Sequence, residues 1–214
     1  MSEQIDRRDE LLLKMYDQLF NDINRHIMVI WQSVSTIIGA FAIFALVEKD
    51  IIPIDVASGI IIVLIVWLIA HLYDAAYWYN RNLVIIANIE RQFLKVSDLK
   101  DIHYYFGKHR PNNVMLTHLK IQYALGVGLL LIVVLYHLSL RVIPGLTEPL
   151  TSFELIRATP YIILILSFFY LRYIRQKRKK AYSEFIENSP GQDVNVASQD
   201  LKYGVGHGFK ETNN

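Results

Sequence analysis

Long apolar runs separated by polar segments dominate the pattern of hydrophobic and polar positions along this 214-residue chain. Four runs have the composition of membrane spans: residues 27–47, 56–73, 121–140 and 159–174. A helix needs about 20 mostly apolar residues to cross about 30 Å of hydrocarbon. The fourth run is short, and it becomes adequate if Arg172 reaches the head groups and Thr159 and Pro160 act as N-cap and first turn. The pattern therefore predicts an all-α integral membrane protein with four transmembrane helices in two hairpins.

The distribution of lysine and arginine predicts the orientation of these spans, because short cytoplasmic loops carry the excess of positive charge. The segment before residue 27, the long segment 74–120 and the stretch after residue 174 are all rich in these residues. The two opposite loops together hold only Lys49, Arg141 and Arg157. We therefore expect both termini in the cytoplasm and a multi-pass protein of the cell inner membrane.

The segment before the first span predicts an amphipathic helix, since its apolar residues recur at helical spacing. These residues are Leu11, Leu12, Met15, Leu19, Phe20 and Ile23. The helix could lie on the membrane surface or pack on the long loop. It could also serve as an address for a partner protein.

The helical pattern does not stop where the second span ends. Pro53 and Asp55 supply a stop and a cap just before this span, and after Tyr73 no glycine or proline occurs until Gly107. We therefore predict that the second helix extends into the cytoplasm. The predicted domains are an amphipathic helix at 1–26, transmembrane hairpins at 27–79 and 121–174, a cytoplasmic helical loop at 80–120, and a basic stretch with a disordered tail at 175–214.

A polar stripe leaves the second span on one helical face, where His71, Asp74 and Arg81 follow each other at helical spacings. Tyrosines and Trp78 beside it fit an ordinary interfacial belt of aromatic residues. Alternatively, the stripe faces polar residues of the first span and forms an ion or water path or a helix contact. The candidate pore or gating residues are His71, Asp74, Arg81, Gln32 and Ser35. Further candidates in or beside the third span are His118, Gln122, Tyr136 and His137.

A second candidate site lies in the long cytoplasmic loop, where aromatic and basic residues alternate. Its candidate partner-binding residues are Tyr104, Tyr105, Lys108 and Arg110. Such a composition can stack and neutralise a nucleotide or a single strand. It also suits residues at an anionic membrane leaflet, which is the interpretation we favour, so nucleic acid is not expected to bind directly.

Composition and motifs exclude several classes of function. With 53% hydrophobic residues the chain is too apolar for an ordinary soluble domain, and it contains no cysteine for disulfides, zinc–thiolate sites or a thiol nucleophile. The motifs HExxH, GxSxG and the Walker loop do not occur. We therefore expect a protein that is not an enzyme and uses no metal or cofactor.

With its amphipathic leader and the segment "YWYNRNLVIIANIERQF", the chain resembles small transmembrane effectors of bacterial anti-phage defence systems, including retron-linked and nucleotide-signalling-linked ones. The resemblance covers residues 10–100, although such effectors often have two spans. It implies a homo-oligomer that a sensor partner keeps silent, and that permeabilises or depolarises the inner membrane when triggered, stopping the infected cell. The alternative is a membrane scaffold that recruits a soluble cytoplasmic partner through residues 80–120 and the basic tail.

Overall fold

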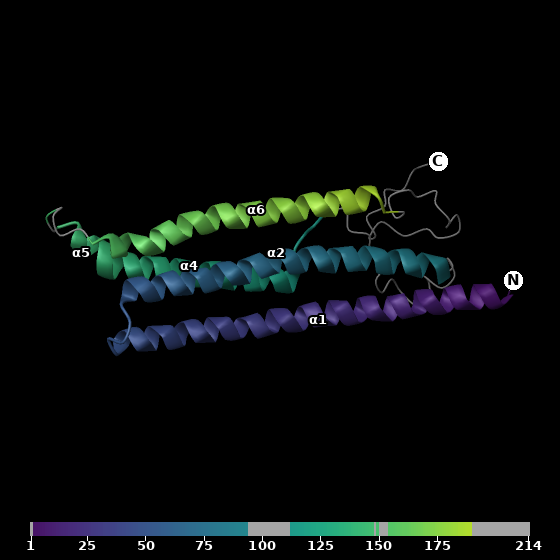
Figure 1. The fold of residues 1–214 in the computed structure, drawn as a ribbon, viewed down its shortest axis with the longest axis horizontal. Helices are drawn as coiled ribbons and strands as arrows, with labels where there is room; N and C mark the ends of the chain where they lie inside the picture. The colour runs from purple at the N-terminus through teal and green to yellow at the C-terminus, as the bar shows by residue number, and fades with distance from the viewer. Residues whose placement is uncertain (1, 94–111, 148, 150–153, 190–214) are drawn as a thin grey trace. The chain divides into compact units, whose positions relative to one another are not determined.

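The computed structural model describes residues 2–93, 112–147, 149 and 154–189, and every regular element in these ranges is a helix (Figure 1). The chain divides into two compact units. We call them the apolar unit, which comprises Val29–Asp74 and Met115–Gln176, and the polar unit, which comprises Met1–Met28, Ala75–Val114 and Lys177–Asn214. The predicted all-α fold class is confirmed for the described residues.

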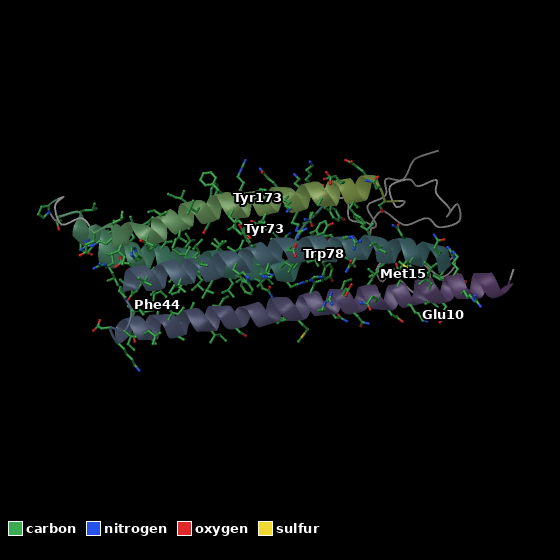
Figure 2. All side chains as sticks on the ribbon, viewed as in Figure 1. Glu10, Met15, Phe44, Tyr73, Trp78 and Tyr173 are labelled. Carbon is green, nitrogen blue, oxygen red and sulfur yellow. The ribbon has the colours of Figure 1, made fainter. Side chains whose placement is uncertain are left out.

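Helix α1 runs from Ser2 to Glu48 without a break, so the predicted leader helix continues into the first apolar run. The prediction of which residues form its apolar face is only partly correct. Leu11 and Met15 are exposed, whereas Ile23 is buried together with half-buried neighbours. Figure 2 shows Met15 and the exposed Glu10 on this helix. Tyr16, which sequence analysis omitted, takes a place on the buried face.

Helix α2 extends from Ile54 to Phe93, so the prediction that the second span continues beyond residue 73 is confirmed. The helix spans about 60 Å at 1.5 Å per residue, twice what a bilayer core requires. Its first half is apolar and its second half, from Ala75 onward, carries several polar and charged residues. We therefore treat the part that ends at Asp74 as the membrane-crossing part.

The start of α2 differs from the prediction in one respect. The carbonyl of Pro53 accepts the first helical hydrogen bond, from the amide of Ala57, at 3.0 Å. Asp55 therefore lies inside the first turn and is not the N-cap residue. Its carboxylate is free to bond side chains from elsewhere in the chain.

The second half of the chain forms two further long helices. Helix α4 runs from Thr117 to His137 and continues through one π-helical turn, η1 at Leu138–Val142, into the short helix α5 at Ile143–Gly145. A 3₁₀ turn, η3 at Leu155–Ala158, then leads into α6 at Thr159–Glu187. The basic stretch after residue 174 is therefore helical, and the predicted disordered tail lies outside the described residues.

Three helices of the described chain are long and apolar enough to cross a membrane: Ile54–Glu90, Thr117–Gly145 and Leu155–Glu187. In α1, the described residues add a shorter apolar helix at Ile37–Glu48. Large aliphatic and aromatic side chains cover the outside of these helices, including Leu131, Ile132, Ile165, Phe168 and Phe169. Soluble proteins rarely expose so much contiguous apolar surface. The structure thus fits a membrane protein.

Helix α2 is the central element of the apolar unit. In the most apolar stretch of α2, 56% of the residues are buried, compared with 22% in the corresponding stretch of α4 and 6% in that of α6. The core consists of aliphatic side chains from α1, α2 and α4: Ala40, Ile61, Ile62, Ile65, Val66, Ile69, Leu129 and Val133. Two glycines allow close packing. A Cβ added at Gly59 would lie 3.1 Å from Ile163 Cδ1, and one at Gly126 would lie 3.5 Å from Ile69 Cγ1.

The polar unit has two small cores built on the second half of α2. On one side, Leu83 and Ile86 pack with Ile23 of α1. On the other, Val84 packs with Tyr182 and Ile186 of α6. Of the placements left open for the leader helix, the described residues show it packed on the segment after the second span.

Candidate functional site

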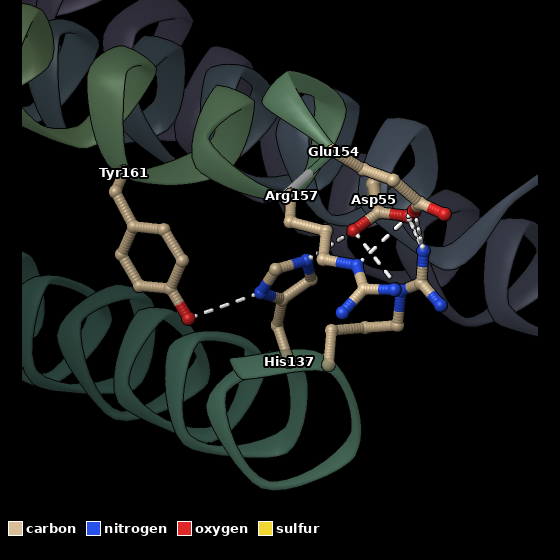
Figure 3. A network of polar contacts seen from close by, with 6 residues as sticks. Asp55, His137, Glu154, Arg157 and Tyr161 are labelled. Atoms are coloured by element: carbon tan, nitrogen blue, oxygen red, sulfur yellow. Dashed lines mark hydrogen bonds and ion pairs between the residues drawn. The ribbon is translucent and has the colours of Figure 1, made fainter. Parts of the chain in front are cut away.

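A buried polar network surrounds Asp55 in the apolar unit, as Figure 3 shows. Asp55 is only 1% exposed, although its side chain is a carboxylate. Its place in the first turn of α2 sets the negative charge near the positive end of the helix dipole. Buried carboxylates require further compensation by hydrogen bonds or cations.

His137, at the end of α4, provides the first of these contacts. Its ring is fully buried, its Nε2 lies 3.0 Å from Asp55 Oδ1, and its Nδ1 lies 3.0 Å from the Tyr161 hydroxyl oxygen. Tyr161 belongs to the first turns of α6. One imidazole thus connects the beginnings of α2 and α6 with the end of α4.

Arg141 provides the charge that balances Asp55. Its Nη2 lies 3.1 Å from Asp55 Oδ2 and its Nε lies 3.3 Å from Oδ1, so the guanidinium contacts both carboxylate oxygens. Arg141 lies in the π-helical turn that begins directly after His137. π-Helical turns are uncommon and frequently mark functional positions.

These contacts assign the proton positions around His137. The guanidinium of Arg141 faces both oxygens of Asp55, so Asp55 is a carboxylate that only accepts. His137 Nε2 must then carry the hydrogen that it donates to Asp55. In the neutral imidazole, Nδ1 accepts the hydroxyl hydrogen of Tyr161. With a neutral imidazole, the chain of hydrogen bonds runs from phenol to imidazole to carboxylate.

Glu154 and Arg157 extend the network toward the surface. Glu154 Oε2 accepts from Arg141 Nη2 at 3.0 Å and from Arg157 Nε at 3.1 Å. The bond and charge of Arg157, together with Arg141, hold the pKa of the Glu154 carboxyl below its usual range. The network contains two carboxylates and two guanidinium groups, so its charges balance. Chemically, it can lock helix ends together or pass a proton along its imidazole.

The candidate residues of the polar stripe lie outside the Asp55 network. His71 is half-buried with its ring edge-on to Trp67 at 4.3 Å, and Asp74 is half-buried. In the polar unit, the guanidinium carbon of Arg81 lies 5.2 Å from the centre of the Trp78 ring and 5.5 Å from that of Phe185.

The remaining candidates have few described contacts. Ser35 is exposed, and the side chain of Gln32 is not described. The candidate partner-binding residues lie outside the described residues: Tyr104, Tyr105, Lys108 and Arg110. His118 is half-buried, Tyr136 is exposed and Gln122 is buried. His137 is the one candidate that belongs to the buried network.

Most of this network was not predicted from the sequence. Asp55 was interpreted as a cap, Arg141 and Arg157 only as loop charges, and Glu154 and Tyr161 were not considered. One local signal was available: His137 and Arg141 are four residues apart, so they share a helix face. The partner of this pair could not be found from spacing alone, because Asp55 is 82 residues away from His137.

Among the described residues, no three potential ligands lie close enough together to hold a metal ion. Comparison of the chain with protein-family models, curated proteins and solved structures found no match.

Removal of the Tyr161 hydroxyl should have a small effect. We expect Tyr161→Phe to lower the free energy of unfolding by about 1 kcal/mol, because it deletes one neutral hydrogen bond and keeps the ring. Thermal unfolding of the purified protein in detergent measures this loss. Tyr170→Phe, at an exposed position of the same helix, is the control and should leave the unfolding temperature unchanged. A loss in Tyr161→Phe as large as that from removing His137 would contradict the proposed proton positions.

Proposed function

We propose that this chain is a membrane-embedded effector that is closed in the described conformation and permeabilises or depolarises the bacterial inner membrane when triggered. The observation that carries the proposal is the Asp55 network, a set of ion pairs that joins helix ends beside an aliphatic core. Its setting in antiviral defence follows the resemblance to small transmembrane effectors. The proposed activity requires no enzymatic step.

The core of the apolar unit supports a closed state. Ile61, Ile65 and Ile69 of α2 pack against Leu129 and Val133 of α4. Aliphatic constrictions exclude ions because they offer no oxygen or nitrogen to replace the hydration shell. Ions would therefore need a rearranged or oligomeric state in which helices separate from this core.

The energetics of the network favour a switching role over a purely stabilising one. Burial of ion pairs costs desolvation energy, and well-packed apolar residues often stabilise a fold equally well. Ionic contacts are instead suited to selecting one of two arrangements, because they are lost together when their geometry changes. We infer that the network holds α2, α4 and α6 in the closed arrangement.

Loss of the Asp55 charge should open this arrangement without a trigger. We expect bacteria that express Asp55→Asn to lose membrane potential and stop growing, whereas cells with the wild-type chain keep their potential. Asp55→Asn retains the shape of the side chain but removes the buried negative charge that Arg141 contacts, so that Arg141 keeps only the exposed Glu154 as an anionic partner. A potential-sensitive dye measures the result during induction.

Asp50→Asn is the matched control. Asp50 is exposed in the turn between α1 and α2, and asparagine tolerates its backbone φ of 54°. The amount of each variant in the membrane fraction is measured in parallel. Full membrane levels of Asp55→Asn with an intact potential would contradict the proposal.

The candidate gating residues can be tested in the same cells. If His71, Asp74 and Arg81 line or gate the conducting path, Asp74→Ala with Arg81→Ala should restore the potential in the Asp55→Asn background. Continued depolarisation at equal membrane levels would exclude this role for Asp74 and Arg81.

Scaffolding is a second candidate function, favoured by exposed lysines on the polar-unit part of α6: Lys177, Lys179 and Lys180. Under this hypothesis, the long loop and the basic tail recruit a soluble partner. A truncation after Lys180 would remove the buried Tyr182 and Ile186. A cleaner test replaces Lys177, Lys179 and Lys180 with glutamine and measures recruitment by pull-down. Unchanged recruitment would exclude these lysines as the binding surface.

A further inference from the structure

A buried carboxylate in the polar unit lies outside the network described above. Glu90, near the end of α2, is only 8% exposed. Its Oε1 accepts a hydrogen bond from the hydroxyl of Tyr16 on α1 at 3.2 Å. Arg8 of α1 bonds Gln92, two residues further along α2, at 3.1 Å. Glu90 therefore lies at the contact between the polar-unit parts of the two helices.

Several cations among the described residues of this unit contact other groups. On α1, Arg8 contacts Asp9, Lys14 contacts Glu10, and Arg25 contacts Asp22. On α6, Lys180 contacts Glu184, while Arg178 lies over the ring of Tyr77. Within the described part of the chain, no cation lies within 4.0 Å of the Glu90 carboxylate, and Tyr16 is its recorded hydrogen-bond partner.

A buried carboxyl group without a cation favours its neutral form, because the charged form loses hydration. Burial raises the pKa of Glu90 from its ordinary value of 4.5 to about 7, and the bond from Tyr16 offsets only part of this effect. The protonated group can accept from Tyr16 through one oxygen while its own hydroxyl hydrogen remains available. The contact is therefore most favourable when Glu90 is neutral.

We propose that Glu90 and Tyr16 form a proton-dependent contact between α1 and α2 of the polar unit, closed while Glu90 holds a proton and weakened when that proton leaves to water. This makes the leader helix sensitive to the pH around the polar unit. The inference stands on the polar unit alone and does not depend on the proposed function.

The direction of the pH effect follows from proton linkage. In the separated state Glu90 ionises near its ordinary pKa of 4.5, and in the closed state it keeps its proton to about pH 7. The contact is therefore strongest below about pH 4.5 and weakens as the pH rises to about 7. Above that value both states are ionised, so no further change is expected.

The absence of cysteine allows a direct measurement of this contact. Met15 of α1 and Phe93 of α2 are both exposed, so Met15→Cys with Phe93→Cys provides two unique sites for spin labels. Pulsed electron resonance on the full chain in lipid nanodiscs then gives the distance distribution between pH 4.5 and 8.5. We expect the ratio of separated to closed populations to rise at least tenfold between pH 5 and 7, and then level off.

Two variants identify the responsible group. Glu90→Gln, which stays neutral, should remove the pH dependence and keep the short distance throughout. Glu10→Gln, at an exposed position on α1, should leave the wild-type profile unchanged. A constant distribution in the wild-type chain over this pH range would overturn the proposal. A pH response that persists in Glu90→Gln would also overturn it, because another group would then be titrating.

Discussion

Replacement of Asp55 by alanine is expected to lower the free energy of unfolding of the apolar unit by about 2–3 kcal/mol, because it removes a buried acceptor of charge-assisted hydrogen bonds. The substitution leaves the Arg141 guanidinium, 31% exposed, without its buried anion, and it removes the acceptor of His137 Nε2. Unfolding of the purified protein by denaturant in mixed micelles measures the loss.

A double-mutant cycle separates the ion pair from other effects of the substitution. Arg141→Met alone should also destabilise the protein, because Asp55 then keeps only His137 as a partner. The free energy of unfolding lost in the double variant should be smaller than the sum of the losses in the two single variants. We expect this difference, the coupling energy, to be about 0.5–3 kcal/mol. Additive losses would show that the Asp55–Arg141 contact contributes nothing, and would remove the basis for treating the network as a lock.

Much of the helical architecture could be predicted because it depends on local patterns. Apolar runs of the right length predicted α2, α4 and α6. The absence of glycine and proline after residue 73 predicted the long extension of α2. Thr159 and Pro160 predicted the start of α6, which begins at Thr159. These signals lie within one helix each, so a single sequence is sufficient to detect them.

The exposed and buried sides of α1 were harder to predict. Leu11, Leu12 and Leu13 are consecutive, so composition alone does not show which of them faces a partner helix. In the structure Leu12 is half-buried, while Leu11 and Leu13 are exposed. The choice depends on where α2 contacts the helix, and a helical wheel drawn for one segment does not contain that information.

The polar network could not be predicted for a related reason. Its members come from four separate segments, and each one has an ordinary local interpretation. Asp55 resembles a helix cap, and Arg157 resembles an interfacial cation. Only tertiary packing brings them together around His137. The sequence pattern indicated the stripe at His71 and Asp74 instead, because its members follow one another on a single helix.

Packing within the apolar unit leads to a second large expected effect, at Gly126 of α4. We expect Gly126→Leu to lower the free energy of unfolding by about 1–3 kcal/mol, since overpacking forces neighbouring side chains or helices to move. A Cβ at this position would already lie 3.5 Å from Ile69 Cγ1 and 3.7 Å from Leu68 Cδ2. Alanine fits this space, whereas the branched end of leucine does not. Thermal unfolding in detergent measures the difference.

Gly128 provides a matched control two residues along the same helix. A Cβ added there meets no atom within 4 Å, so Gly128→Leu gains the same helix propensity without steric conflict. Lipid is as apolar as leucine, and close packing therefore contributes more to helix association in a bilayer than burial alone. If Gly126→Leu and Gly128→Leu unfold at the same temperature, α4 does not pack on α2 through Gly126. If only Gly126→Leu is destabilised, this glycine sets how closely α4 approaches α2 around Leu68 and Ile69.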